Sequence, residues 1–116
     1  MAVIKPNTEK INQDLNVEAR NAVERKVNSF RGELIKLGVT PNQAAIDFVH
    51  QNILKEMPPL KIETLIPVFG IGNPTQETIK RYIQLAKNVA TEAVESKLTK
   101  EKVLQLFAEF KKQQKH

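Results

Sequence analysis

Apolar residues recur every three or four positions in the first third of this chain, and this spacing constrains its fold more than any other feature. The series consists of Ile11, Leu15, Ala19, Val23, Val27, Phe30, Leu34 and Leu37. Such spacing lines one side of an α-helix, and Gly38 directly afterwards can adopt the left-handed conformation that ends a helix. We therefore expect a first helix over about residues 8–37, with Asn7 or Thr8 as its N-cap.

Two later segments carry the same helix-start signal. Thr40-Pro41-Asn42-Gln43 and Asn73-Pro74-Thr75-Gln76 each provide a capping side chain, a proline suited to the first helical position and a glutamine. The first segment predicts a helix over about residues 41–56, which Pro58-Pro59 would end. The second predicts a longer helix over residues 77–98.

The rest of the chain predicts two more helices. Thr99 is expected to cap a last helix, in which Val103, Leu106, Phe107 and Phe110 form an apolar stripe. The connecting region 60–71 is ambiguous, because its apolar spacing suits a short helix over about residues 60–66 while Pro67 would disrupt the last turn. An extended apolar connector is the alternative.

These elements predict an all-α fold, with four main helices and one short helix in an antiparallel, bundle-like domain. The chain has 116 residues, of which 41% are hydrophobic and 27% charged, as expected for one globular domain over residues 1–116. Short connections favour antiparallel neighbours. We expect residues 1–7 and 112–116 to be flexible ends.

The residue inventory argues against an enzyme. The chain has no cysteine and only two histidines, His50 in the second helix and His116 at the end. Neither is spaced from carboxylates as a metal site or a catalytic triad requires. We therefore expect no catalytic site, metal, cofactor or small-molecule substrate.

The charge distribution favours a polyanionic partner. The net charge is +5, and residues 59–116 contribute most of it, with 10 basic and 6 acidic side chains. No segment is apolar enough to span a membrane, and the N-terminus lacks the apolar core of a signal peptide. We expect a cytoplasmic protein that does not act at a membrane.

The polar side of the helix over residues 77–98 is the first candidate site. Lysine and arginine can contact phosphates, while glutamine and threonine can contact phosphates or base edges. The candidate nucleic-acid-binding residues are Thr75, Gln76, Lys80, Arg81, Gln84 and Lys87, together with Lys111, Lys112 and Lys115 near the C-terminus. A solvated helix face without a binding role is the alternative.

Two nearby patterns match known nucleotide-binding or DNA-binding motifs only weakly. The loop Gly70–Thr75 has glycines before a helix, but it lacks the spacing of a phosphate-binding loop. Residues 65–82 resemble a helix-turn-helix in outline, but Pro67 falls in the first helix and the turn is long. We therefore interpret the loop as a connection and cap.

A protein partner is the second possibility. A helix of about 30 residues would be about 45 Å long, which is hard to cover within a chain of this size. The uncovered part would suit a partner helix or a second copy of the chain. The candidate partner-binding residues are Leu34, Leu37, Leu65 and Phe69.

Two hypotheses follow. The first is a small non-catalytic protein, a homodimer, that binds nucleic acid as an accessory or regulatory factor. The second is a protein–protein adaptor or assembly subunit that uses an exposed apolar stripe, with the basic charge incidental.

Overall fold

A computed structural model describes residues 7–69, 71–72 and 74–113 of the chain. No β-strand occurs among these residues, and the predicted all-α class is confirmed. The described helices are α1 (Thr8–Ser29), α2 (Arg31–Lys36), α3 (Gln43–Lys55), α4 (Ile62–Leu65), α5 (Gln76–Lys97) and α6 (Lys100–Gln113). Helices α1, α3, α5 and α6 are the four main ones, and α2 and α4 are short.

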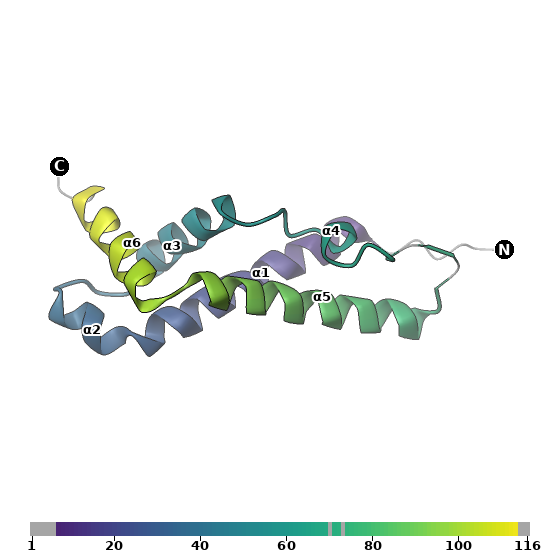
Figure 1. Cartoon of the computed structure of the whole chain (residues 1–116), viewed down its shortest axis with the longest axis horizontal. Coiled ribbons are helices and arrows are strands. Elements are labelled where there is room, and N and C mark those ends of the chain that lie inside the picture. The colour runs from purple at the N-terminus through teal and green to yellow at the C-terminus, as the bar shows by residue number, and fades with distance from the viewer. Residues whose placement is uncertain (1–6, 70, 73, 114–116) are drawn as a thin grey trace.

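Helix α1 is the element against which most of the others pack. Its most extensive contact is with α5, and it also contacts α3, α4 and α2. In Figure 1, α1 and α5 both run from the right of the molecule to the left, whereas α3 runs in the opposite direction. The successive helices α1, α3 and α5 thus alternate in direction, which leaves α1 and α5 parallel. The molecule is elongated, with extents of 60 × 25 × 19 Å.

The core is almost entirely aliphatic, as the low aromatic content of the sequence requires. Several small side chains of α1 and α5, which pack against each other, are fully buried: Ala19 and Ala22 of α1 and Ala86 and Ala90 of α5. Alanine side chains allow two packed helices to approach closely. Phe107 of α6 is the largest fully buried side chain.

The prediction of one helix over residues 8–37 is wrong, because the chain breaks at Phe30 into α1 and α2. Phe30 leaves the helical region at φ −106° and ψ 16°, and its N–H donates to the carbonyl oxygen of Val27, three residues back instead of four. The break changes the direction of the following turn. Leu34 is fully buried, while Leu37 is 49% exposed.

Side-chain caps define most of the helix starts. The Asn42 side chain accepts a hydrogen bond from the N–H of Ala45 at 2.8 Å, so α3 begins at Gln43. The predicted start at residue 41 is therefore wrong, because Pro41 lies before the cap instead of inside the helix. The predicted cap at Thr99 is confirmed: its hydroxyl oxygen accepts from a backbone N–H three residues later at 3.2 Å.

The ambiguous connector contains one helical turn. Helix α4 covers Ile62–Leu65, within the predicted range of residues 60–66, and ends before Pro67. The N–H of Ile62 donates to the Asn12 side-chain oxygen of α1 at 2.9 Å. This bond satisfies a backbone group at the start of α4 and fixes the connector to the first helix.

Helix α6 closes the other end of the molecule. Its Lys102 pairs with Glu56 at the end of α3 at 2.7 Å, and its Lys100 pairs with Glu33 of α2 at 3.7 Å. Exposed ion pairs contribute little to stability. The position of α6 depends mainly on its buried apolar side, including Phe107 and Phe110, whose ring lies 5.4 Å from that of Phe48 in α3.

The predicted flexible ends are only partly within the described residues. Asn7 caps α1, and Lys112 and Gln113 are helical, so the last helix extends further than predicted. Residues 1–6 and 114–116 lie outside the described ranges. None of the described helices combines the length and the apolar character needed to cross a bilayer.

Candidate nucleic-acid interface

The start of α5 is defined by Thr75. Its hydroxyl oxygen accepts a hydrogen bond from the N–H of Thr78 at 3.1 Å, and the two hydroxyl oxygens are 2.9 Å apart. The cap satisfies one of the free N–H groups at the helix start. Thr75 was predicted as a nucleic-acid-binding residue, and its hydroxyl already has this structural role.

The predicted binding residues of α5 lie on its solvent side. Gln76, Lys80, Arg81 and Gln84 are exposed, and Lys87 is half-buried at the margin of this side. The opposite side of α5 packs mainly against α1 and α4. We call these five residues the outer face of α5; at 1.5 Å per residue, they span about 17 Å of the helix.

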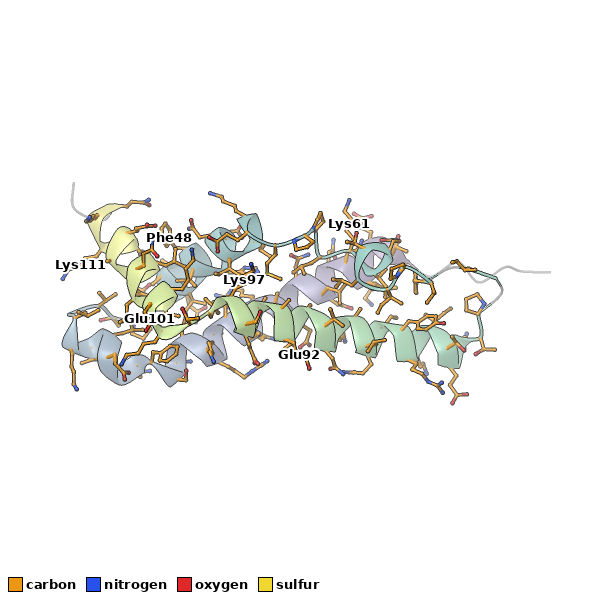
Figure 2. The ribbon with its side chains drawn as sticks, in the orientation of Figure 1. Phe48, Lys61, Glu92, Lys97, Glu101 and Lys111 are labelled. Carbon is orange, nitrogen blue, oxygen red and sulfur yellow. The ribbon has the colours of Figure 1, made fainter. Side chains whose placement is uncertain are left out.

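The outer face has a modest positive charge. In the part of the chain that the structure describes, neither Lys80 nor Arg81 forms an ion pair. Glu77 lies on the same side one turn before Arg81, and Glu92 and Glu95 lie beyond its C-terminal end. Figure 2 labels Glu92 on the C-terminal half of α5, with Lys97 at the end of the helix. The basic residues of the outer face lie between Lys80 and Lys87, before these acidic positions.

The C-terminal lysines do not join the outer face. Lys111 is labelled at the left end of the molecule in Figure 2, whereas α5 begins at the right end. The Lys111 ammonium group donates to the carbonyl oxygen of Leu37 at 3.3 Å. Lys112 is exposed on the same last turn of α6, and Lys115 lies outside the described residues. Lys111 and Lys112 therefore lie apart from the outer face of α5, and their role in binding nucleic acid stays a prediction.

The predicted partner-binding residues do not form one surface either. Leu34 is fully buried and cannot reach a partner, while Leu65 and Phe69 are half-buried and pack against the core. The Phe69 ring contacts Tyr82 of α5 edge-on, with ring centroids 6.5 Å apart. Only Leu37 is exposed, and it lies at the opposite end of the molecule from α4.

The structure describes the loop before α5 only in part. Gly70 and Asn73 lie outside the described residues. Gly72 has a φ of +77°, a conformation that favours glycine for the turn itself. The single turn of α4 is also shorter than the first helix of a helix-turn-helix, so that outline is not formed.

His50 is a buried residue of α3. It is 6% exposed, and its Nε2 atom has no hydrogen-bond partner among the described residues. Burial lowers the pKa of His50 below 6.5, the nearby Arg20 guanidinium lowers it further, and Asp47 partly opposes both effects. The neutral form is therefore favoured, as for a packed core histidine. No group of three His, Cys, Asp or Glu side chains that could hold a metal occurs in the described ranges.

Sequence reasoning missed the polar contacts between distant segments, and two of them lie close to residues that it had singled out. Arg20 of α1 reaches α3, where its Nε donates to Asp47 at 2.6 Å and its guanidinium also contacts Gln43. The second is the contact between Lys111 and Leu37, which joins segments 74 positions apart. Both join residues far apart in the chain, and helical periodicity gives no signal for such pairs.

Comparison of the chain with protein-family models, with curated proteins and with solved structures found no match.

Proposed function

We propose that this chain is a small, non-catalytic, all-α protein that binds nucleic acid through the outer face of α5, as an accessory or regulatory factor. The observation that supports this proposal is the exposure of Gln76, Lys80, Arg81 and Gln84 on one solvent-facing side of α5. Basic and amide side chains on an exposed helix can contact phosphates and base edges together. Because the cysteine-free sequence suits a reducing compartment, we place this activity in the cytoplasm.

The geometry of α5 suits a groove of duplex nucleic acid. The major groove of DNA is about 12 Å wide and admits one α-helix. Helix α5 packs on one side only, and its N-terminal half forms the lower edge of the molecule in Figure 1. Lys80 and Arg81 are adjacent in sequence and about 100° apart around the helix, so they could contact phosphates of both strands.

Salt dependence tests this proposal most simply. We would measure binding of the full chain to a fluorescent DNA duplex of about two helical turns and to a single-stranded RNA of similar length. Three phosphate contacts, from Lys80, Arg81 and Lys87, would lower the affinity for the duplex about 40-fold between about 50 mM and about 200 mM salt. No binding of either probe at low salt would contradict the proposal.

A matched pair of double variants locates the site. Lys80→Glu with Arg81→Glu should abolish binding at the higher salt concentration and reduce the salt slope. Lys55→Glu with Lys61→Glu changes the net charge equally at exposed positions on α3 and in the connector. If both double variants lowered affinity equally, general charge would explain the binding, and the assignment to α5 would be wrong.

An adaptor or assembly subunit remains the second candidate, and Leu37 is the predicted partner-binding residue that is exposed. The predicted seam of Leu34, Leu37, Leu65 and Phe69 does not form one exposed surface, and the apolar stripe of α1 is buried. What favours an adaptor is the exposure of Ile35 and Leu37 next to basic side chains. The predicted homodimer stays a prediction, which sedimentation of the full chain would test.

A further inference from the structure

A groove between α3 and α6 has a volume of about 540 Å³, and we call it the α3–α6 groove. Its lining includes Asp47, Phe48, Gln51 and Lys55 of α3 and Phe110 of α6. The ring centroids of Phe48 and Phe110 lie 5.4 Å apart, so these two rings join the helices at the groove. Phe48, labelled in Figure 2, is only half-buried. The groove thus combines an aromatic contact with exposed polar side chains.

Three polar residues of α3 form one row along this groove. Asp47, Gln51 and Lys55 are all exposed, and all three line the α3–α6 groove. They are four residues apart, and residues at this spacing lie one above the other on the same side of a helix. We call these three residues the α3 ridge; at 1.5 Å per residue it is about 12 Å long.

The Asp47 end of the α3 ridge is negative. Arg20 Nε donates to Asp47 Oδ1 at 2.6 Å, and the same guanidinium pairs with Glu24 at 3.4 Å. One positive group is therefore shared by two carboxylates, which leaves one negative charge in excess. The Asp47 side chain is 56% exposed, so a second cation can reach it.

The Lys55 end of the α3 ridge is positive. The neighbouring carboxylate, that of Glu56, pairs with Lys102 of α6 at 2.7 Å. Lys55 itself forms no ion pair with any residue in the described ranges. The two ends of the ridge therefore carry opposite charges, with the uncharged Gln51 midway between them.

We propose that the α3 ridge binds the α3 ridge of a second copy of the chain, antiparallel to it, about a two-fold axis beside Gln51. In a two-fold interface, each residue contacts its counterpart twice, once in each direction. Asp47 and Lys55 are equally far from Gln51, so two Asp47–Lys55 ion pairs form between the copies. Rows of side chains four residues apart also pack together at the commonest helix crossing angle, about −50°.

The order of charges along the α3 ridge favours a second copy over other partners. A nucleic acid would be repelled at the Asp47 end, and an acidic or basic protein segment would match only one end. An antiparallel copy matches both ends, because it presents the same charges in reverse order. No residue of α5 is needed for this interface, so the inference does not rest on nucleic-acid binding.

The first test places a thiol at the proposed two-fold axis. The chain has no cysteine, so Gln51→Cys gives each molecule a single thiol. Two helices packed about 8–10 Å apart bring facing Cα atoms within the range that a disulfide spans. We expect Gln51→Cys to form a covalent dimer on mild oxidation at least about tenfold faster than Gln105→Cys, at an exposed position of α6. Equal rates would overturn the proposal.

A charge exchange tests the pairing of Asp47 with Lys55. Lys55→Asp places two carboxylates together at both pairs and should weaken the dimer at least about tenfold in sedimentation equilibrium. Lys61→Asp makes the same charge change at an exposed position outside the groove and should leave the dimer unchanged. Circular dichroism checks that each variant folds.

Mixing two variants tests the antiparallel arrangement itself. The Lys55→Asp chain and the Asp47→Lys chain have complementary ridges, so they should form a heterodimer although neither dimerises well alone. A mixture of the two folded variants that stays monomeric would contradict the proposed pairing. A wild-type chain that is monomeric even at about 100 µM would also contradict it, as would a dimer that Lys55→Asp leaves intact.

Discussion

The two ends of this elongated molecule differ in the polar contacts that accompany their apolar packing. At the end formed by α2, α3 and α6, the core around Phe107 is accompanied by exposed ion pairs between helices, Lys102–Glu56 and Lys100–Glu33. At the end formed by α4 and the start of α5, the contacts are mainly aliphatic, with the Phe69–Tyr82 pair. The long-range polar bond at that end joins Ile62 to Asn12.

The two candidate surfaces also differ in what positions their residues. The outer face of α5 is one side of a single regular helix, so its residues are positioned by helical geometry alone. The α3–α6 groove is formed by two helices far apart in the chain, so it depends on how α6 packs. Changes that loosen α6 should therefore affect the α3–α6 groove before they affect α5.

The largest expected effect comes from the core at the α6 end. Phe107→Ala removes the largest fully buried side chain and should lower the free energy of unfolding by about 3–5 kcal/mol. Phe69→Ala at the other end removes a half-buried ring and should cost clearly less. Urea unfolding measures the free energy of unfolding of both variants. A larger decrease for Phe69→Ala would mean that the core is packed more tightly at the α4 end than at the α6 end.

A smaller effect should follow from the polar contacts between helices. Asn12→Ala leaves the part-buried N–H of Ile62 without its acceptor and should cost about 1–3 kcal/mol. Lys102→Ala breaks an exposed ion pair and should cost no more than about 1 kcal/mol. Equal losses in urea unfolding would show that the α4 connector does not depend on this bond.

The pH dependence of stability should reveal the protonation of His50. Its pKa is lower in the folded state than the ordinary value of 6.5, so the unfolded chain takes up a proton first as the pH falls. The free energy of unfolding should therefore decrease below about pH 6.5, by at most about 1.4 kcal/mol per pH unit, and level off below the folded pKa. Above that window, both states are neutral at His50 and stability is unaffected.

The control for this effect is His50→Leu, which removes the titrating group and the unpaired Nε2 atom. Thermal unfolding at a series of pH values between 7 and 5 compares the two proteins. The variant should lose the part of the pH dependence assigned to His50. An unchanged pH profile in the variant would mean that other groups determine it.

The smallest effect on stability should come from the outer face of α5. Lys80→Glu with Arg81→Glu alters exposed side chains that form no ion pair in the described part of the chain. We expect a change of no more than about 0.5 kcal/mol per substitution in urea unfolding. A large decrease in the free energy of unfolding would show that these residues have a structural role. A binding defect in the variant could then result from instability instead of a lost contact with nucleic acid.

Local sequence signals predicted the helices well and their assembly poorly. The apolar spacing located α5 and α6, and the predicted cap at Thr99 marked the start of α6, because both signals act within one helix. The cap of α5 is Thr75, after the proline, and not a residue before it as the start signal suggested. The break at Phe30 was missed, because the apolar spacing continues across it. Leu34 was predicted to reach a partner, but it belongs to the same apolar stripe as Val27 and packs in the core.

For the candidate site, too, features set within one helix were predicted and features set by packing between helices were not. The exposure of Lys80 and Arg81 follows from the helical projection and was predicted. The separation of Lys111 from α5, and its contact with Leu37, depend on the packing of α6 on α3. The chain alone gave no signal for that packing, so the α3–α6 groove could be recognised only in the folded molecule.

The most direct test of the nucleic-acid proposal is the affinity for the DNA duplex of two variants measured side by side at low salt. One is Lys80→Glu with Arg81→Glu, and the other is Arg31→Glu with Lys36→Glu on α2, which changes the net charge equally. We predict a large loss of affinity for the α5 variant and little change for the α2 variant. An equal loss in both, or a larger loss for the α2 variant, would contradict the assignment of nucleic-acid binding to the outer face of α5.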